Sequence, residues 1–160
     1  MSDIIISRWG RLRGRLFHLY FRIKRPMTLG VRALVYDSAS NSVFLIRHTY
    51  VPGWQLPGGG VETGETLQEA LTKELMEEGN IVLTDAPNLF AVYFNRRASV
   101  RDHVVLYVCN SFNQTAPKLP DHEIAESGFF PLDALPQGTT RATKDRLAEV
   151  FHSRPIPHDW

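Results

Sequence analysis

Two hydrophobic periods divide this chain of 160 residues into predicted helices and strands. Near the start, apolar side chains recur every three or four residues, a spacing that predicts an amphipathic helix ending at Pro26. Its apolar stripe is Ile5, Trp9, Leu12, Leu16, Leu19 and Ile23. Thr66–Glu78 and Thr140–His152 are predicted to form two further helices.

Shorter apolar runs bounded by turn residues predict strands. The predicted strands are Thr28–Tyr36, Val43–Thr49, Ile81–Thr84, Leu89–Phe94, Asp102–Phe112 and a short one at Gly128–Pro131, with loops at Tyr50–Gly58, Asn95–Arg101 and Asn113–Glu126. Because helices and strands are mixed along the chain, we expect an α/β sandwich. We divide the chain into an N-terminal helix (1–27), one mixed domain (28–152) and a C-terminal tail (153–160).

The predicted helix Thr66–Glu78 carries acidic and apolar side chains on the same side. Glu74, Glu77 and Glu78 follow an i, i+3, i+4 spacing, and like charges at that spacing repel by roughly 0.2–0.5 kcal/mol per pair. Leucine side chains share the side of Glu74 and Glu78, so this side turns away from water. A cation should therefore neutralise the acids, and clustered carboxylates suit Mg²⁺ or Mn²⁺.

Local signals mark both ends of this helix. Thr66 is a candidate N-cap, and Glu69 three residues later completes a capping box. Gly79 and Asn80 end the helix, because both residue types tolerate the left-handed conformation. The glycines of Leu56–Gly60, before the helix, allow the backbone to approach a ligand closely.

The stretch 59–81 resembles the signature of the Nudix (MutT-like) hydrolases, Gly-x5-Glu-x7-Arg-Glu-U-x-Glu-Glu-x-Gly-U, where U is aliphatic. Gly59 and Glu65 match its first two positions, and Lys73–Ile81 aligns with the remainder. All four acids of the pattern are in register, which makes the match far more specific than a short glycine motif. The resemblance implies a Nudix fold, with a mixed sheet between α-helices, over about residues 28–152.

The resemblance also implies roles for individual residues. Glu74 and Glu78 look like metal ligands, with Glu77 as a further ligand or water contact. The backbone carbonyl near Gly59 would complete the ligand set, and Glu65 looks like a supporting acid. The implied reaction is metal-dependent hydrolysis of a diphosphate linkage in a nucleoside diphosphate derivative, by attack of water on phosphorus.

Two positions depart from the signature. Asn80 replaces the last Gly, a mild change because Asn also accepts a positive φ. Lys73 replaces Arg and offers a point charge instead of a planar fork. Lys73 can pair with Glu69 or Glu77, each four residues away, so we expect activity to survive with looser orientation of the acids.

The general base varies within the family, and a helix glutamate or a distant loop acid can serve. The loop candidates are Glu123 and Glu126, of which we favour Glu123. Substrate contacts are harder to assign, because each candidate has an alternative role in an ion pair, on the exposed surface or in the core. These candidates are Arg32, Arg47, His48, Tyr50, Trp54 and Arg96, with Arg97 and Arg101 beside the last.

Composition adds limits. Residues 1–27 carry seven Lys or Arg and one acid, whereas the rest of the chain carries 11 basic and 16 acidic residues. This helix is expected to dock on the domain or on a second copy in a homodimer. Contact with acidic lipids, nucleic acid binding and a transit peptide are alternatives.

The single cysteine, Cys109, lies in an apolar run, so we expect a buried thiol and favour a cytoplasmic location.

Two other functions fit the same signature less well. A Nudix-fold sensor that only binds nucleotides usually lacks some of the acids, all of which are present here. An isomerase of the isopentenyl-diphosphate type needs a cysteine near the site, and Cys109 is a poor candidate.

Overall fold

The computed structural model describes residues 17, 20 and 23–160. Its strands are β1 (Thr28–Asp37), β2 (Ser42–His48), β3 (Ile81–Leu83), β4 (Asn88–Phe94), β5 (Asp102–Cys109), β6 (Phe112–Gln114) and β7 (Ile124–Pro131). The helices are α2 (Leu67–Gly79) and α3 (Arg141–Phe151). Most of the predicted N-terminal stripe, with any dimer contact through it, lies outside the described residues. Ile23 is described and is 73% exposed.

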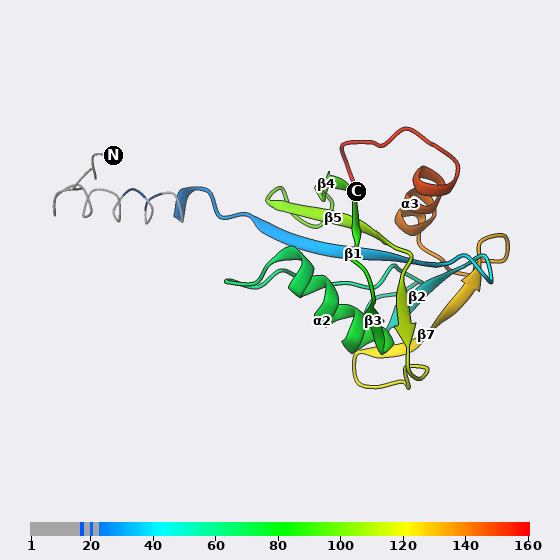
Figure 1. Cartoon of the computed structure of the whole chain (residues 1–160). Helices are drawn as coiled ribbons and strands as arrows, with labels where there is room; N and C mark the ends of the chain where they lie inside the picture. Colours follow the sequence, from blue (N-terminus) through cyan, green and yellow to red (C-terminus); the bar gives the residue numbers. More distant parts are fainter. Residues whose placement is uncertain (1–16, 18–19, 21–22) are drawn as a thin grey trace, which may run out of the picture.

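Five strands form one mixed sheet in the order β4-β5-β1-β2-β7, with only β1 and β5 parallel. The short strands β3 and β6 form a separate antiparallel pair. Helices α2 and α3 cover opposite faces of the large sheet (Figure 1). The predicted α/β architecture, a mixed sheet between helices, is therefore confirmed.

Each face of the sheet has its own hydrophobic core. Val31, Ala33 and Val35 of β1 pack toward α2, whereas Leu34 packs toward α3. This alternation follows from the two-residue period of a strand. Because both faces are covered, the central strands are almost continuously apolar, as in the fully buried run Val43–Ile46.

Two strand predictions were wrong in their limits. The predicted strand Asp102–Phe112 is two strands, because β5 ends at Cys109 and β6 leaves the large sheet to pair with β3. The predicted short strand Gly128–Pro131 is the end of β7, which begins at Ile124 and pairs with β2 along its length. Polar residues occupy the first half of β7 because several of its side chains are only half-buried.

The sheet opens between β1 and β2 at the end that holds the site. The two strands pair only near their turn, at Tyr36↔Val43 and Asp37↔Ser42. Farther along, the loop after β2 fills the gap: Ile46 pairs with Gln55 on one side. On the other side the Ala33 N–H donates to the Pro57 carbonyl and the Val31 N–H to the Gly59 carbonyl, both at 2.9 Å. The glycine-rich loop is thereby held in the middle of the sheet.

The C-terminal residues return to the domain along β4. The Phe94 N–H donates to the His158 carbonyl at 2.8 Å, and the Trp160 N–H donates to the Phe94 carbonyl at 3.1 Å. The Trp160 ring then packs against the buried Tyr93, with 5.3 Å between ring centres. Within the described part of the chain, no helix has the length and apolar character needed to cross a bilayer.

Candidate active site

The glycine loop lies directly against the acids of α2. Gly58 has φ +137°, and a Cβ there would overlap the Val31 carbonyl oxygen. A Cβ on Gly59 would overlap the Glu74 carboxylate. Gly58 therefore needs glycine for its backbone conformation, whereas a side chain at Gly59 would displace the Glu74 carboxylate. The backbone reaches the carboxylates at this point because no side chain intervenes.

Helix α2 begins and ends as its sequence predicts. The Thr66 side chain accepts from the Glu69 N–H, and the Glu69 carboxylate accepts from the Thr66 N–H, so the capping box is confirmed. Asn80 adopts the left-handed conformation at the other end, with φ 52°. The rotation of the helix that buries Ala70, Leu71 and Leu75 also buries Glu78.

The three helix acids have different surroundings. Glu78 is 3% exposed, Glu74 is half-buried, and Glu77 points to solvent. The Gly58 N–H donates to Glu78 Oε2 at 2.6 Å, which fixes this carboxyl against the loop. Burial raises the pKa of Glu78 to about 8, although the Gly58 N–H and Arg32 oppose the shift. Burial also raises the pKa of Glu74, with Lys73 acting in the opposite direction. A bound cation would favour the ionised form of both carboxyls.

Residues distant in sequence join Glu78 at the ends of β2 and β7. The Nε2 atom of His48 lies 3.7 Å from Glu78 Oε1. Three potential ligand atoms lie within 4.8 Å of one another, one from each of His48, Glu78 and Glu123. Burial, reinforced by Arg32, lowers the pKa of His48, which favours a neutral imidazole. The cluster thus combines carboxylate oxygens with an imidazole nitrogen.

The loop that carries Glu123 is held in place by several hydrogen bonds. Asp121 Oδ1 accepts from the N–H groups of Glu123 and Ile124, both at 2.8 Å. The Thr49 N–H donates to the Glu123 carbonyl at 2.9 Å. The Tyr50 hydroxyl donates to Glu123 Oε1 at 3.0 Å, so the side chain itself is also oriented.

Two of the basic candidates lie in different places. Arg32 Nη1 donates to the carbonyls of Leu56 and Gly58, so Arg32 holds the glycine loop from the side of β1. Arg47 instead pairs with Glu126 at 2.9 Å and lies over the Trp54 ring at 5.9 Å. The ion pair that sequence reasoning kept as an alternative for Arg47 is therefore present, and it also occupies Glu126.

Other sequence candidates have roles away from the carboxylates. Trp54 is 9% exposed and packs edge-on against Phe130, with 4.7 Å between ring centres, so it belongs to the core facing α3. Arg96 is exposed and lies 3.8 Å from Asp159 of the tail. Neither residue joins the acid cluster in this structure.

Lys73 pairs with Glu65, with Nζ 3.6 Å from Oε1. The expected pairing with Glu69 or Glu77 is not the one formed, because Glu69 is engaged in the capping box. Glu65 also accepts from the Glu62 N–H at 3.0 Å. The Lys73–Glu65 pair therefore links the residue before the N-cap of α2 to the middle of this helix.

A pocket of about 180 Å³ lies beside the glycine loop, between Leu56 and the start of α3. It is lined by Arg32, Gln55, Leu56, Asn95, Val104, Thr140, Ala142, Thr143 and Trp160. Sequence reasoning missed Asn95, Thr140 and Trp160, because they come from separate segments and carry no local motif. The one usable signal was the single aromatic residue of the tail, Trp160.

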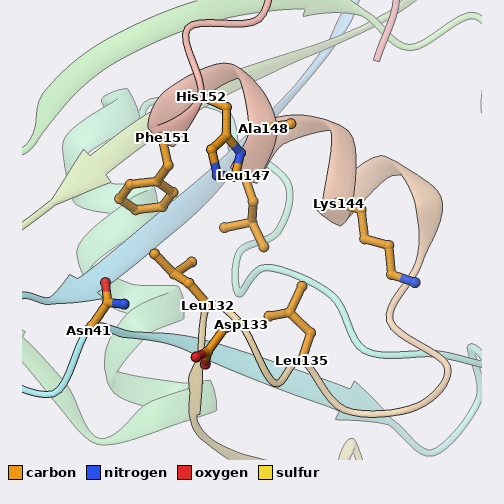
Figure 2. Close-up of a pocket in the computed structure, with 9 residues that line it drawn as sticks. All are labelled: Asn41, Leu132, Asp133, Leu135, Lys144, Leu147, Ala148, Phe151 and His152. Atoms are coloured by element: carbon orange, nitrogen blue, oxygen red, sulfur yellow. The ribbon is translucent and has the colours of Figure 1, made fainter.

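A second cavity, of about 600 Å³, lies between α3 and the loop after β7 (Figure 2). Its lining is Asn41, Leu132, Asp133, Leu135, Lys144, Leu147, Ala148, Phe151 and His152. No acid of α2 lines it, so this cavity lies apart from the carboxylates of the candidate site.

Comparison with known proteins agrees with this geometry. The family model for the NUDIX domain matches residues 26–151. An ADP-ribose pyrophosphatase from Methanocaldococcus jannaschii is 31% identical over 102 residues, which are 61% of this chain and 59% of that protein. Nudix hydrolase 25 of Arabidopsis thaliana is 39% identical over 56 residues, 32% of each protein. This chain thus matches less than two thirds of the length of either relative.

Solved structures extend the similarity to almost whole domains. The MutT NUDIX hydrolase from Burkholderia pseudomallei is 27% identical with a TM-score of 0.65, covering 77% of this chain and 97% of that one. An ADP-ribose pyrophosphatase from Streptococcus suis has a TM-score of 0.62 at 22% identity, covering 82% and 96%, and shows the same fold. From the matched family model and the loop-and-helix geometry together, we conclude that this chain belongs to the Nudix hydrolase family.

Proposed function

We propose that this protein is a metal-dependent pyrophosphohydrolase that cleaves the diphosphate linkage of a nucleoside diphosphate derivative. One observation carries the proposal: Glu78 is buried against the backbone of Gly58, with Glu74, Glu123 and His48 around it. Buried carboxyls with raised pKa values, gathered beside a glycine loop, are costly for a fold and are typical of functional sites.

The donor set fits a divalent cation. Glu74 and Glu78 would hold it, with the Gly59 carbonyl as a third oxygen and exposed Glu77 as a further ligand or water contact. Such oxygen donors suit Mg²⁺ or Mn²⁺. When bound, such an ion would neutralise the phosphate charges and position the leaving group.

Glu123 is our choice for the general base. Its carboxylate lies in the cluster with Glu78 and is oriented by the Tyr50 hydroxyl. It would accept the proton from water as the water oxygen bonds to phosphorus and the bond from phosphorus to the bridging oxygen breaks. Glu126, the alternative, is engaged with Arg47.

We propose that the 180 Å³ pocket binds the group attached to the diphosphate. Sites for whole ligands usually exceed about 300 Å³, so this pocket holds a part of the substrate. Its Trp160 ring offers a surface for stacking, and the amides of Asn95 and Gln55 offer donors and acceptors, a combination that suits a nucleobase. Arg32 lies between this pocket and the acids, where it can contact phosphate.

Neither rival function gains support from the geometry. The acids that a sensor would not need are present, and Glu78 is buried, which costs the fold stability. Cys109 lies in the core facing α2, where burial raises its pKa to about 12, so it is a poor acid for an isomerase. A buried free thiol also fits the reducing cytoplasm that we propose as the location.

The proposal is tested by measuring hydrolysis with Mg²⁺ and with Mn²⁺ across a substrate panel. The panel contains nucleoside triphosphates and their oxidised forms, ADP-ribose, nucleotide sugars, dinucleoside polyphosphates, NADH and 5′-triphosphate RNA. We expect turnover of one class, lost by at least about 100-fold in Glu78→Gln. Nucleotide binding without turnover of any member would contradict the enzyme and support the sensor.

A further inference from the structure

His48 occupies an unusual place for a polar side chain. It is the last residue of β2, beside a register shift in the pairing with β7, and it is 8% exposed. Its Nδ1 atom is buried and makes no hydrogen bond of ordinary geometry within the described part of the chain, although the Glu123 backbone lies beside the ring. Because Nδ1 is turned into the fold, Nε2 is the ring nitrogen available to a ligand.

The other ring nitrogen of His48 faces a carboxylate that it does not bind. Nε2 lies 3.7 Å from Glu78 Oε1, which is longer than a hydrogen bond. The second oxygen of Glu78 is already used, because it accepts from the Gly58 N–H at 2.6 Å. His48 Nε2 and Glu78 Oε1 therefore face each other at a distance too long for a hydrogen bond.

The fold holds both sides of this gap. Glu78 is fixed by α2 and by Gly58, and His48 is fixed by pairing with Ile124. Divalent ions bond ligand nitrogen and oxygen atoms at about 2.1–2.2 Å, so two donor atoms 3.7 Å apart could share one ion.

We propose that His48 supplies an imidazole nitrogen ligand to the divalent ion held by Glu78, and that this ligand makes the site prefer a transition ion such as Mn²⁺ over Mg²⁺. Mg²⁺ selects oxygen ligands, whereas imidazole nitrogen favours transition metals. The inference depends on the proposed role of Glu78 as a metal ligand.

The test uses the full chain loaded with Mn²⁺ alone, without substrate. Pulsed electron paramagnetic resonance detects nitrogen bonded directly to Mn²⁺. We expect this nitrogen signal in the natural protein, its loss in His48→Gln, and its retention in His122→Gln and His103→Gln. His122 is the matched control because it lies exposed beside Glu123, and His103 lies on β5, stacked on Phe94.

Affinities give a second readout. We expect His48→Gln to weaken Mn²⁺ binding about 10-fold, measured by titration. Mg²⁺ binding, measured by competition with Mn²⁺, should change less than about threefold, because the glutamine offers an oxygen. Circular dichroism and thermal unfolding establish that each variant is folded. The nitrogen signal of the natural protein tests the proposal even if a variant does not fold.

Several outcomes would overturn the assignment. Mn²⁺ bound to the natural protein without a nitrogen signal excludes His48 as a ligand and leaves the metal-dependent hydrolase standing. A signal that persists in His48→Gln, or is lost in His122→Gln, assigns the nitrogen to another residue. If Mn²⁺ does not bind, or binds equally well to Glu78→Gln, the metal site of the proposed function itself is overturned.

Discussion

Glu78 shows how one residue sets the requirements of its surroundings. It lies on the helix side that carries Leu71 and Leu75, so the packing that forms the core also removes its carboxyl from water. The Gly58 N–H satisfies one oxygen, but no Lys or Arg of the described residues forms an ion pair with the carboxylate. Burial therefore dominates the pKa of Glu78, and the site favours either a proton or a metal ion.

The raised pKa of Glu78 predicts a pH-dependent stability in the absence of metal. The folded state keeps the proton up to about pH 8, whereas the unfolded chain loses it near 4.5. Because the folded state binds more protons in this window, stability falls as pH rises through it. From pH 6.5 to 8 we expect Glu78 to lower the free energy of unfolding by roughly 1–2 kcal/mol.

This loss is measured by urea unfolding with a chelator present, at several pH values. Glu78→Gln is the matched control, because it keeps an acceptor for the Gly58 N–H and cannot ionise. The difference between the natural protein and the variant should change across the window, and this pH dependence should become small when Mg²⁺ saturates the natural protein. A difference that stays constant with pH would show that Glu78 titrates near its ordinary value.

Glu123 and Glu126 provide a second prediction at the residue scale. Glu123 lies with Glu78, whereas Glu126 pairs with Arg47 on the neighbouring strand. We expect Glu123→Gln to lower kcat by about 100-fold or more, and Glu126→Gln to leave kcat within about threefold. Steady-state rates on the substrate found in the panel measure both. Equal losses, or a larger loss in Glu126→Gln, would remove Glu123 as the base.

At the scale of elements, the glycine loop and α2 form one unit. The loop is bound to β1 by backbone hydrogen bonds and to α2 through Gly58 and Glu78. The capping box fixes where α2 begins, and therefore which of its side chains reach the loop. The position of the acids relative to the backbone of the loop is a property of both elements together.

Glycine substitutions in this loop test the unit. Gly58→Ala places a Cβ against the Val31 carbonyl at a φ of +137°, so we expect a loss of about 1–3 kcal/mol in stability and loss of activity. Gly60→Ala is the matched control, because a Cβ there meets nothing within 4 Å. Thermal unfolding and hydrolysis of the panel substrate measure both. A Gly58→Ala protein as stable and active as Gly60→Ala would show that the loop does not need this conformation.

At the scale of the whole molecule, the ends of distant segments meet around one opening of the sheet. The 180 Å³ pocket takes Arg32 from β1, Val104 from β5, Thr143 from α3 and Trp160 from the tail. The tail is held by backbone hydrogen bonds to Phe94 and by the Arg146 guanidinium, 5.0 Å from the centre of the Trp160 ring. If this pocket binds the substrate as proposed, substrate selection depends on the docking of the tail.

We therefore expect Trp160→Leu to raise KM by about 10-fold for a substrate with a nucleobase, with kcat changed little, because stacking is lost and the acids are untouched. Ile156→Ala is the control, since Ile156 is an exposed tail residue that does not line the pocket. Steady-state kinetics separate KM from kcat. An unchanged KM would show that the nucleobase binds elsewhere. A fall in kcat alone would point to a structural effect on the site.

Much of the local structure could be predicted from short-range signals. Thr66, Glu69 and Asn80 marked the ends of α2, because capping depends on residues three or four positions apart. The periods of apolar residues located most strands within a few positions. The limits of β5, β6 and β7 were missed, because a strand ends where its partner ends, and the partners β2 and β3 are distant in sequence.

The sequence by itself determined the family, the acid-bearing helix and the need for glycine before it, since these depend on spacing within 23 consecutive positions. Only the tertiary structure decided which acid is buried, that His48 and Glu123 join it, and that Arg47 and Trp54 do not. The reason is physical: burial and contact between distant segments arise from the opening of the sheet between β1 and β2, which no local pattern records.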